Sequence, residues 1–309
     1  MPYICRIIEV MSELRDTFGQ WMKGISYEIA FWNNVYRWKH TFQGMMHWSH
    51  YGSEIQLEAF DANQFLISKN SPLVLDVGCG MSYATGNFIN KEHQLVTLDI
   101  RYIDPLAPYF NRILKRHHKD LPAITFGMME YLSAFYPQNH VDLIIIQNAL
   151  DHSANPNKGI IEALNCLKVG GILYLNHHPN EAEKEHYKGF HQYNITHKEG
   201  QLVIWNKATH WNISQLLEKF AETTVSVCDN GHVVAVIRKT DDVPTEALTD
   251  HQDKREMAEQ LITMSQYQRQ IGYAVRCKLE YWLFNTIQFF AQALPWSLKM
   301  SLKKLIKQA

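Results

Sequence analysis

VLDVGCGMS, the stretch at residues 74–82, decides the fold class of this chain. An apolar run that ends in glycine is typical of a parallel strand buried on both faces of a sheet. Gly78 and Gly80 let the chain turn tightly and leave no side chain between the backbone and a ligand that crosses the strand end. Because ligands of open α/β sheets bind at the carboxyl ends of the strands, the stretch predicts a strand followed by a ligand-binding turn.

Three further apolar runs, at residues 94–100, 141–150 and 170–178, alternate with helical stretches. The clearest helix is expected at 156–168, with Asn155 as its N-cap and glycines after its end. Strands that alternate with helices indicate a doubly wound α/β sheet. Two later strands are expected on either side of an Asp-Asn-Gly turn, which predicts that they are antiparallel neighbours.

The chain divides into three predicted regions. Residues 1–70 are rich in aromatic side chains at helical spacing, which predicts a helical cap. Residues 71–240 carry the α/β pattern, and residues 241–309 begin with a charged, proline-containing linker that leads to a C-terminal helical appendage. The appendage includes residues 281–298, which have no charged side chain. It has three open interpretations: packing on its own chain, a homodimer seam, or peripheral contact with the inner face of a membrane.

Composition excludes several classes of function. Thirty basic and 31 acidic residues give a formal charge of −1, so no nucleic-acid partner is predicted. The five cysteines are scattered without a C-x-x-C pair, which argues against a zinc cage or a disulfide framework and favours a reducing, cytoplasmic location. The N-terminal sequence does not have the pattern of a signal peptide.

The type of ligand follows from three residues around the glycines. Asp99 is expected to end the second strand, where its carboxylate can accept two hydrogen bonds from a ribose diol. Tyr83 stands where a dinucleotide motif requires glycine or alanine, and Asp76 would repel a diphosphate. The sequence therefore argues against NAD and favours a nucleoside-containing ligand with a cationic or zwitterionic group.

The segments DVGCGMS, TLDI, FGMMEYL, DLIIIQNALDHS and LKVGGILYL occur here in the order found in class I S-adenosylmethionine-dependent methyltransferases. The chain resembles this family over residues 70–180, and more loosely to about 240, and is most similar to small-molecule and sugar methyltransferases of bacterial biosynthetic clusters. The resemblance implies a Rossmann-like, seven-stranded sheet and S-adenosyl-L-methionine as cofactor. The residues that it assigns to the cofactor are Asp76, Gly78, Cys79, Gly80, Asp99, Ile100, Met128, Met129, Gln147 and Asn148.

Methylation of an alcohol also needs a group that removes the acceptor's proton. Asp151 and His152 directly follow the predicted third strand, and His191 lies in the insertion at 189–205; these three are the predicted catalytic residues. Alternatives are Glu181 and one residue of the His177–His178 pair. No metal is predicted, because no carboxylate-rich cluster has hard-cation spacing and the histidine pair has no evident third ligand.

The predicted function is methyl transfer from S-adenosylmethionine to the oxygen of a sugar or related intermediate, as in polysaccharide biosynthesis. Methylation of carbon or nitrogen on a lipid-like or quinone-like acceptor is one alternative, and a non-catalytic assembly module is another. Acceptor specificity is expected to lie in the insertion at 189–205 and in the cap, around Trp48, His50 and Tyr51, where aromatic rings can stack on a sugar.

Overall fold

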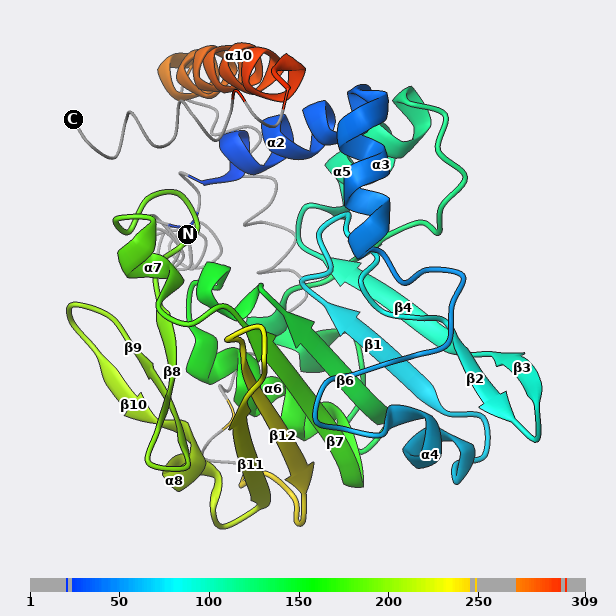
Figure 1. The fold of residues 1–309 in the computed structure, drawn as a ribbon. Coiled ribbons are helices and arrows are strands. Elements are labelled where there is room, and N and C mark those ends of the chain that lie inside the picture. Colours follow the sequence, from blue (N-terminus) through cyan, green and yellow to red (C-terminus); the bar gives the residue numbers. More distant parts are fainter. Residues whose placement is uncertain (1–20, 22–23, 245–247, 249–270, 296–297, 299–309) are drawn as a thin grey trace, which may run out of the picture.

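The computed structural model describes residues 21, 24–244, 248, 271–295 and 298. A seven-stranded sheet with the order β11-β12-β7-β6-β1-β4-β5 forms its centre (Figure 1). All neighbouring strands are parallel except β12, which is antiparallel to both β7 and β11. The predicted doubly wound α/β sheet and the predicted antiparallel pair are therefore confirmed. The strands are β1 (Leu73–Val77), β4 (Asp99–Asp104), β5 (Thr125–Phe126), β6 (Val141–Gln147), β7 (Leu167–His177), β11 (Ala221–Val227) and β12 (Val233–Lys239).

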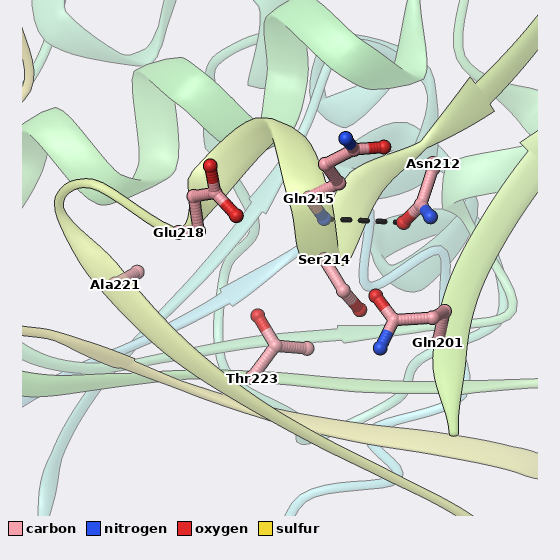
Figure 2. Close-up of a pocket in the computed structure, with 7 residues that line it drawn as sticks. All are labelled: Gln201, Asn212, Ser214, Gln215, Glu218, Ala221 and Thr223. Atoms are coloured by element: carbon pink, nitrogen blue, oxygen red, sulfur yellow. Dashed lines mark hydrogen bonds between the residues drawn. The ribbon is translucent and has the colours of Figure 1, made fainter. Parts of the chain in front are cut away.

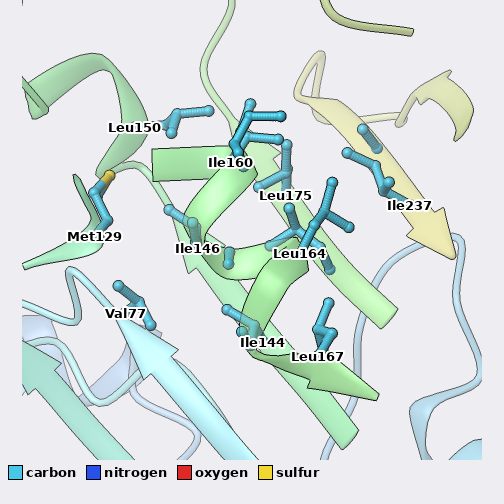
Figure 3. Packing of buried hydrophobic residues seen from close by; sticks show 14 of the residues in the cluster. Val77, Met129, Ile144, Ile146, Leu150, Ile160, Leu164, Leu167, Leu175 and Ile237 are labelled. Carbon is cyan, nitrogen blue, oxygen red and sulfur yellow. The ribbon is translucent and has the colours of Figure 1, made fainter. Parts of the chain in front are cut away.

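Successive side chains of the central strands enter two different cores. In β6, Ile144 and Ile146 join the cluster beneath α6, whereas Leu143 and Ile145 join the cluster beneath α4 (Ala62–Ile67). Because side chains of a strand alternate between the two faces, continuous apolar runs are what a sheet covered on both faces requires. Figure 3 shows the first cluster, in which Ile160 of α6 lies over β6 and β7.

The predicted strand at 94–100 is wrong in its bounds. Residues Gln94–Thr97 form β3, which pairs with β2 (Phe88–Lys91) in a separate two-stranded hairpin, and β4 of the main sheet begins only at Asp99. Leu95 and Val96 in the hairpin are exposed, so this apolar run is not a buried strand. The strand that enters the sheet continues instead through the buried residues Tyr102 and Ile103.

The helix predicted at 156–168 is confirmed at its start and ends early. It is α6 (Pro156–Cys166), and the Asn155 side chain accepts a hydrogen bond from the backbone N–H of Lys158 at 3.1 Å. Leu167 already begins β7, so the glycines at 170 and 171 lie within that strand and do not terminate the helix. Three other helices follow strands of the main sheet. The α-helix α5 (Ala107–Arg116) follows β4, and the short 3-10 helices η1 (Met129–Ala134) and η2 (Leu150–His152) follow β5 and β6.

The insertion after β7 forms a small antiparallel sheet beside the main one. It contains α7 (Glu181–Lys184), β8 (Asn194–Lys198), β9 (Gln201–Trp205) and β10 (His210–Asn212), followed by α8 (Ile213–Leu217). Ile195, Leu202 and Ile204 join the same apolar cluster as β6 and α6. The small sheet is therefore packed on the core of the large one, and it places the loop before β8 close to the ends of β6 and β7.

The cap consists of α2 (Ile25–Arg37) and α3 (Lys39–Trp48), and α10 (Ile271–Ala293) lies across α2 (Figure 1). Asn285 of α10 accepts hydrogen bonds at its side-chain oxygen from Asn33 at 3.1 Å and from Asn34 at 3.0 Å. Four exposed apolar residues lie on the side of α10 away from Asn285, namely Leu279, Leu283, Ile287 and Phe290, and Trp282 is exposed beside them. Among the described helices, none combines the length and the apolarity needed to cross a bilayer.

Asn285→Ala is expected to lower the free energy of unfolding by about 1–2 kcal/mol, because it leaves the side-chain N–H groups of Asn33 and Asn34 without their acceptor. Urea unfolding monitored by tryptophan fluorescence measures the change. Ile287→Ala is the control, because this side chain is 52% exposed and lies on the side of α10 away from Asn285. An equal loss in both variants would show that the Asn285 hydrogen bonds do not stabilise the cap.

Candidate functional site

The glycine turn follows β1 in the way that the sequence predicts. Gly78 and Gly80 have φ angles of +70° and +54°, in the left-handed region that favours glycine. The N–H groups of Gly78 and Cys79 both donate to the carbonyl oxygen of Ile103, which anchors the turn to the end of β4. A Cβ atom on Gly78 would lie 2.5 Å from the Cβ atom of Ala149, after β6, so a side chain does not fit here.

Asp104 ends β4 next to this turn. Its carboxylate accepts hydrogen bonds from the N–H of Gly80 at 3.0 Å and from the N–H of Leu106 at 2.7 Å. Burial raises the pKa of Asp104 to about 7, although both N–H groups favour the ionised form. A buried carboxylate at the end of the second parallel strand has the position at which ribose hydroxyls are bound in dinucleotide sites.

Asp99 does not end its strand, contrary to the expectation from sequence. It is the first residue of β4 and pairs with Leu73, at the start of β1. It lies roughly 16 Å along the strand from Asp104, given about 3.3 Å per residue. Its exposed carboxylate binds Arg101, with 2.8 Å between Oδ1 and Nε. Ile100, which the resemblance also assigns to the cofactor, is next to it and pairs with Val74, so both residues lie far from the glycine turn along β4.

Asp76 and the cap close the other side of the turn. Asp76 is buried and accepts a hydrogen bond from Thr85 Oγ1 at 2.8 Å, and burial raises its pKa to about 6 despite this bond. Trp32 of α2 lies so close to Gly80 that a Cβ atom there would be 3.0 Å from the indole ring. Tyr36 of the same helix donates a hydrogen bond to the carbonyl oxygen of Met81 at 2.7 Å. The aromatic cap is therefore packed directly on the turn.

The segment after β5 contributes buried thioethers and a buried carboxylate. Met128 and Met129 are both nearly inaccessible, and Met129 packs against Gly159 of α6. Glu130 accepts hydrogen bonds from the N–H groups of Ala154 and Asn155, at 2.8 Å and 3.3 Å. Met128, which the resemblance assigns to the cofactor, is thus part of the apolar cluster that contains Tyr131 and residues of the cap.

Gln147 and Asn148 lie at the end of β6, at the same edge of the sheet. Gln147 Nε2 is buried and has no hydrogen-bond partner within the described part of the chain. Asn148 has a φ angle of +44°, and its side-chain oxygen accepts a hydrogen bond from the N–H of His178 at 3.0 Å. Gln147 therefore presents a donor that a ligand can satisfy, whereas Asn148 holds the ends of β6 and β7 together.

The three predicted catalytic residues come together in one cluster. His191 Nδ1 lies 2.8 Å from Asp151 Oδ2, and His152 Nε2 lies 3.1 Å from His191 Nδ1. Asp151 and His152 belong to η2 after β6, whereas His191 precedes β8; the N–H of Gln192 donates to the carbonyl oxygen of Asp151 and fixes the two segments. This arrangement could take up a proton from an alcohol placed beside it.

Burial and charge have opposite effects on the pKa values in this cluster. Burial alone would raise the pKa of Asp151, but the charges of the neighbouring histidines and the hydrogen bond from His191 hold it below its usual range. Burial alone would lower the pKa of His191, but its hydrogen bond to Asp151 raises it. His177, among the other candidates, is fully buried, and desolvation lowers its pKa to about 4. Glu181 is near the cluster, and burial raises its pKa.

A polar surface pocket with a volume of about 350 Å³ lies between the small sheet and β11 (Figure 2). Its lining residues are Gln201, Asn212, Ser214, Gln215, Glu218, Ala221 and Thr223. None of the predicted site residues is among them. Only Gln201 lies in the insertion to which acceptor specificity was assigned.

Two residues of the site were not found by sequence reasoning. Asp104 is followed by Pro105 and by a helix with a strongly apolar face, and this change of period from strand to helix marks the true end of the strand. Trp32 was included only in the general aromatic content of the cap. Its contact with Gly80 has no local signal, because it depends on how α2 packs across the sheet edge.

Comparisons with known proteins show which family part of this chain matches. Residues 75–175 match the protein family described as methyltransferase domain. No curated protein matches the sequence. Similar solved structures include the 16S rRNA N2 G1207 methyltransferase from T. thermophilus in complex with AdoMet and guanosine, at 13% identity and a TM-score of 0.34. The alignment with that enzyme covers 62% of this chain and 42% of the other.

Two further structures are similar at the same level. A SAM-dependent methyltransferase from Aquifex aeolicus has 13% identity and a TM-score of 0.33, over 57% of this chain and 88% of the other. A protein from Pyrococcus horikoshii has 14% identity and a TM-score of 0.34, over 56% of this chain and 84% of the other. These likenesses carry no inference about substrate.

Proposed function

We propose, from the premise that this chain carries a class I S-adenosylmethionine-dependent methyltransferase domain, that it methylates the hydroxyl oxygen of a sugar or related small intermediate. The observation that carries the proposal is that the cluster of Asp151, His152 and His191 lies at the same sheet edge as the glycine turn. Ala149, two residues before Asp151, touches that turn directly. A ligand on the turn and an acceptor at the cluster would therefore be neighbours.

The residues at this edge fit S-adenosyl-L-methionine, the cofactor of the family. The glycine turn leaves the backbone free of side chains, and Asp104 stands where a ribose diol would be bound. The unpartnered Nε2 of Gln147 suits the carboxylate of an amino-acid group, and buried Asp76 suits its ammonium group. The ribose diol, the carboxylate and the ammonium group of the cofactor thus each have a complementary residue.

The cofactor supplies a methyl group that is already activated on a sulfonium, so the protein mainly has to align and deprotonate the acceptor. His191, oriented by its hydrogen bond to Asp151, takes the hydroxyl proton. The oxygen then forms a bond to the methyl carbon while the carbon–sulfur bond breaks, and that electron pair stays on sulfur. The products are a methyl ether and S-adenosylhomocysteine.

The rim of the cap supports a sugar-like acceptor. Trp48 is 79% exposed at the end of α3, and Tyr51 is partly exposed and packs edge-on against Tyr83. Exposed aromatic rings offer apolar faces on which a pyranose can stack. The cap therefore offers a surface for a ring-shaped polar acceptor close to the segment that follows the glycine turn.

The test has two parts. Calorimetric titration with S-adenosylhomocysteine is expected to show one site per chain, and transfer of labelled methyl to a panel of sugars and nucleotide sugars is expected to give an alkali-stable ether. Absence of cofactor binding would overturn the whole proposal. Binding together with methylation at carbon or nitrogen of quinone or lipid precursors would overturn the choice of an oxygen acceptor.

Affinity for S-adenosylhomocysteine is expected to rise about tenfold between pH 6 and pH 8. Asp104 has a pKa of about 7 and Asp76 one of about 6, so both carboxylates ionise as the pH rises through this range and then accept or attract the ligand's donors. Titrations at pH 6, 7 and 8 measure the effect. Asp104→Asn should flatten the upper part of the profile; an affinity that falls with pH would contradict the assignment.

A further inference from the structure

Three potential metal ligands converge in the cluster. Asp151 Oδ2, His152 Nε2 and His191 Nδ1 form a triangle with sides of 2.8, 3.1 and 3.5 Å. The sequence separates His191 from Asp151 by 40 residues, so their spacing gave no metal motif. The sequence therefore showed no sign that these three donors meet, and the expectation of no metal did not take them into account.

The size of this triangle matches a divalent ion. Zinc and similar ions bind imidazole nitrogen and carboxylate oxygen at about 2.0–2.2 Å. An ion about 2.1 Å from all three atoms would have ligand–metal–ligand angles of roughly 85–115°, between octahedral and tetrahedral coordination. Two imidazoles and one carboxylate on one side of an ion form the donor set typical of transition metals, not of magnesium or calcium.

Unsatisfied buried polar atoms occur on Asp151 itself and on the nearby His177. Asp151 is 2% exposed, and its second carboxylate oxygen, Oδ1, has no hydrogen-bond partner among the described residues. His177 is 1% exposed, and neither of its ring nitrogens has a hydrogen-bond partner in the part of the chain that the structure describes, although it lies close enough to Asp151 and His152 to interact with their charges. Buried polar groups are normally satisfied, so these atoms leave the polar environment of the cluster incomplete, which favours a further polar or charged group there.

We propose that Asp151, His152 and His191 bind one divalent transition-metal ion, such as zinc, manganese or cobalt. The side chains of both histidines remain about one-quarter exposed, so the ion would keep open coordination positions toward the solvent side. Three protein ligands with open positions characterise catalytic metal sites, whereas structural zinc sites are closed by four ligands.

The role of the ion in the reaction rests on the proposed function. The acceptor's hydroxyl oxygen would occupy an open position, and coordination would lower its pKa so that the proton passes to solvent water. The oxygen would then bond to the methyl carbon as the carbon–sulfur bond breaks, with no change in the metal's oxidation state. In the metal-bound enzyme, His191 would donate its lone pair to the ion, and it would not take the proton of the acceptor's hydroxyl.

Cobalt(II) titration of the full-length chain, after removal of metals with a chelator, tests the proposal. We expect one cobalt per chain with a Kd in the micromolar range or below, and a change in the visible absorption of the ion as imidazole replaces water. Asp151→Asn and His191→Gln should each weaken binding at least tenfold. His210→Gln, at an exposed histidine outside the cluster, should bind cobalt as the unmodified chain does.

Titration with S-adenosylhomocysteine shows that the variants are folded, and it tests the proposed function independently of the metal. Equal cobalt binding by the unmodified chain and both cluster variants would overturn the metal site, as would a Kd weaker than about 100 µM. If cobalt binds as expected but methyl transfer is the same with and without chelator, the site stands and its role in the reaction is wrong.

Discussion

Asp104→Asn is expected to weaken binding of S-adenosylhomocysteine by roughly 10- to 100-fold, whereas Asp99→Asn leaves it unchanged. Hydrogen bonds to a charged group contribute about 1.5–3 kcal/mol, and each carboxylate oxygen of Asp104 retains a lone pair beyond those used by Gly80 and Leu106. Asp99 lies at the other end of β4 and is occupied by Arg101. Calorimetric titration measures both affinities.

These two variants form a matched pair, since the same chemical change is made at the two ends of one strand. Thermal unfolding of Asp104→Asn without ligand controls for damage to the turn, because the substitution also alters the acceptor of the Gly80 N–H. The opposite pattern, with Asp99→Asn losing affinity and Asp104→Asn retaining it, would show that the strand end does not bind the ribose.

His191→Gln is expected to lower kcat by about 10²- to 10⁴-fold, with the affinity for S-adenosylhomocysteine unchanged, because it removes the group that activates the acceptor's hydroxyl. Asp151→Asn should have a similar effect, since the hydrogen bond of 2.8 Å that His191 Nδ1 donates to Asp151 Oδ2 orients the ring. Initial rates at saturating cofactor, over a range of acceptor concentrations, separate kcat from KM.

His210→Gln is again the control and should retain the rate of the unmodified chain. A His191→Gln variant that keeps more than about one-tenth of kcat would exclude His191 from activation of the acceptor. A rise in KM alone would instead place His191 among the groups that bind the acceptor without taking part in its activation.

Local sequence patterns predicted those elements of the fold whose structure is determined by residues within one short segment. The apolar run of β1, the two glycines after it and the N-cap at Asn155 each act within a few residues, and all three are found as predicted. The prediction for the run at 94–100 was wrong because a hairpin arm and a buried strand can have similar apolar sequences. The two differ in whether other elements cover both faces of the segment, and the sequence of the segment does not show this.

Predictions for the site depended on long-range packing to different degrees. Asp151 and His152 were found because they follow a strand end, which is a local signal. Their meeting with His191, and the contact of Trp32 with Gly80, depend on the path of the insertion and the cap across the sheet edge. The helical and strand periods of apolar residues do not predict such contacts between distant segments. The limits of the three regions stay a prediction, since cap and sheet side chains share one apolar cluster.

The hydrogen bonds of Asn285 connect residues that are 251 and 252 positions apart in the chain. During synthesis, the last strand of the sheet ends at Lys239 and is translated before α10, which begins at Ile271. The cap must wait for α10, a segment about 250 residues further along the chain. A newly made chain would therefore pass through a stage in which the sheet is folded and the cap does not yet have its hydrogen bonds to α10. Premature termination before α10 would leave molecules in that stage permanently, with apolar cap residues available for aggregation.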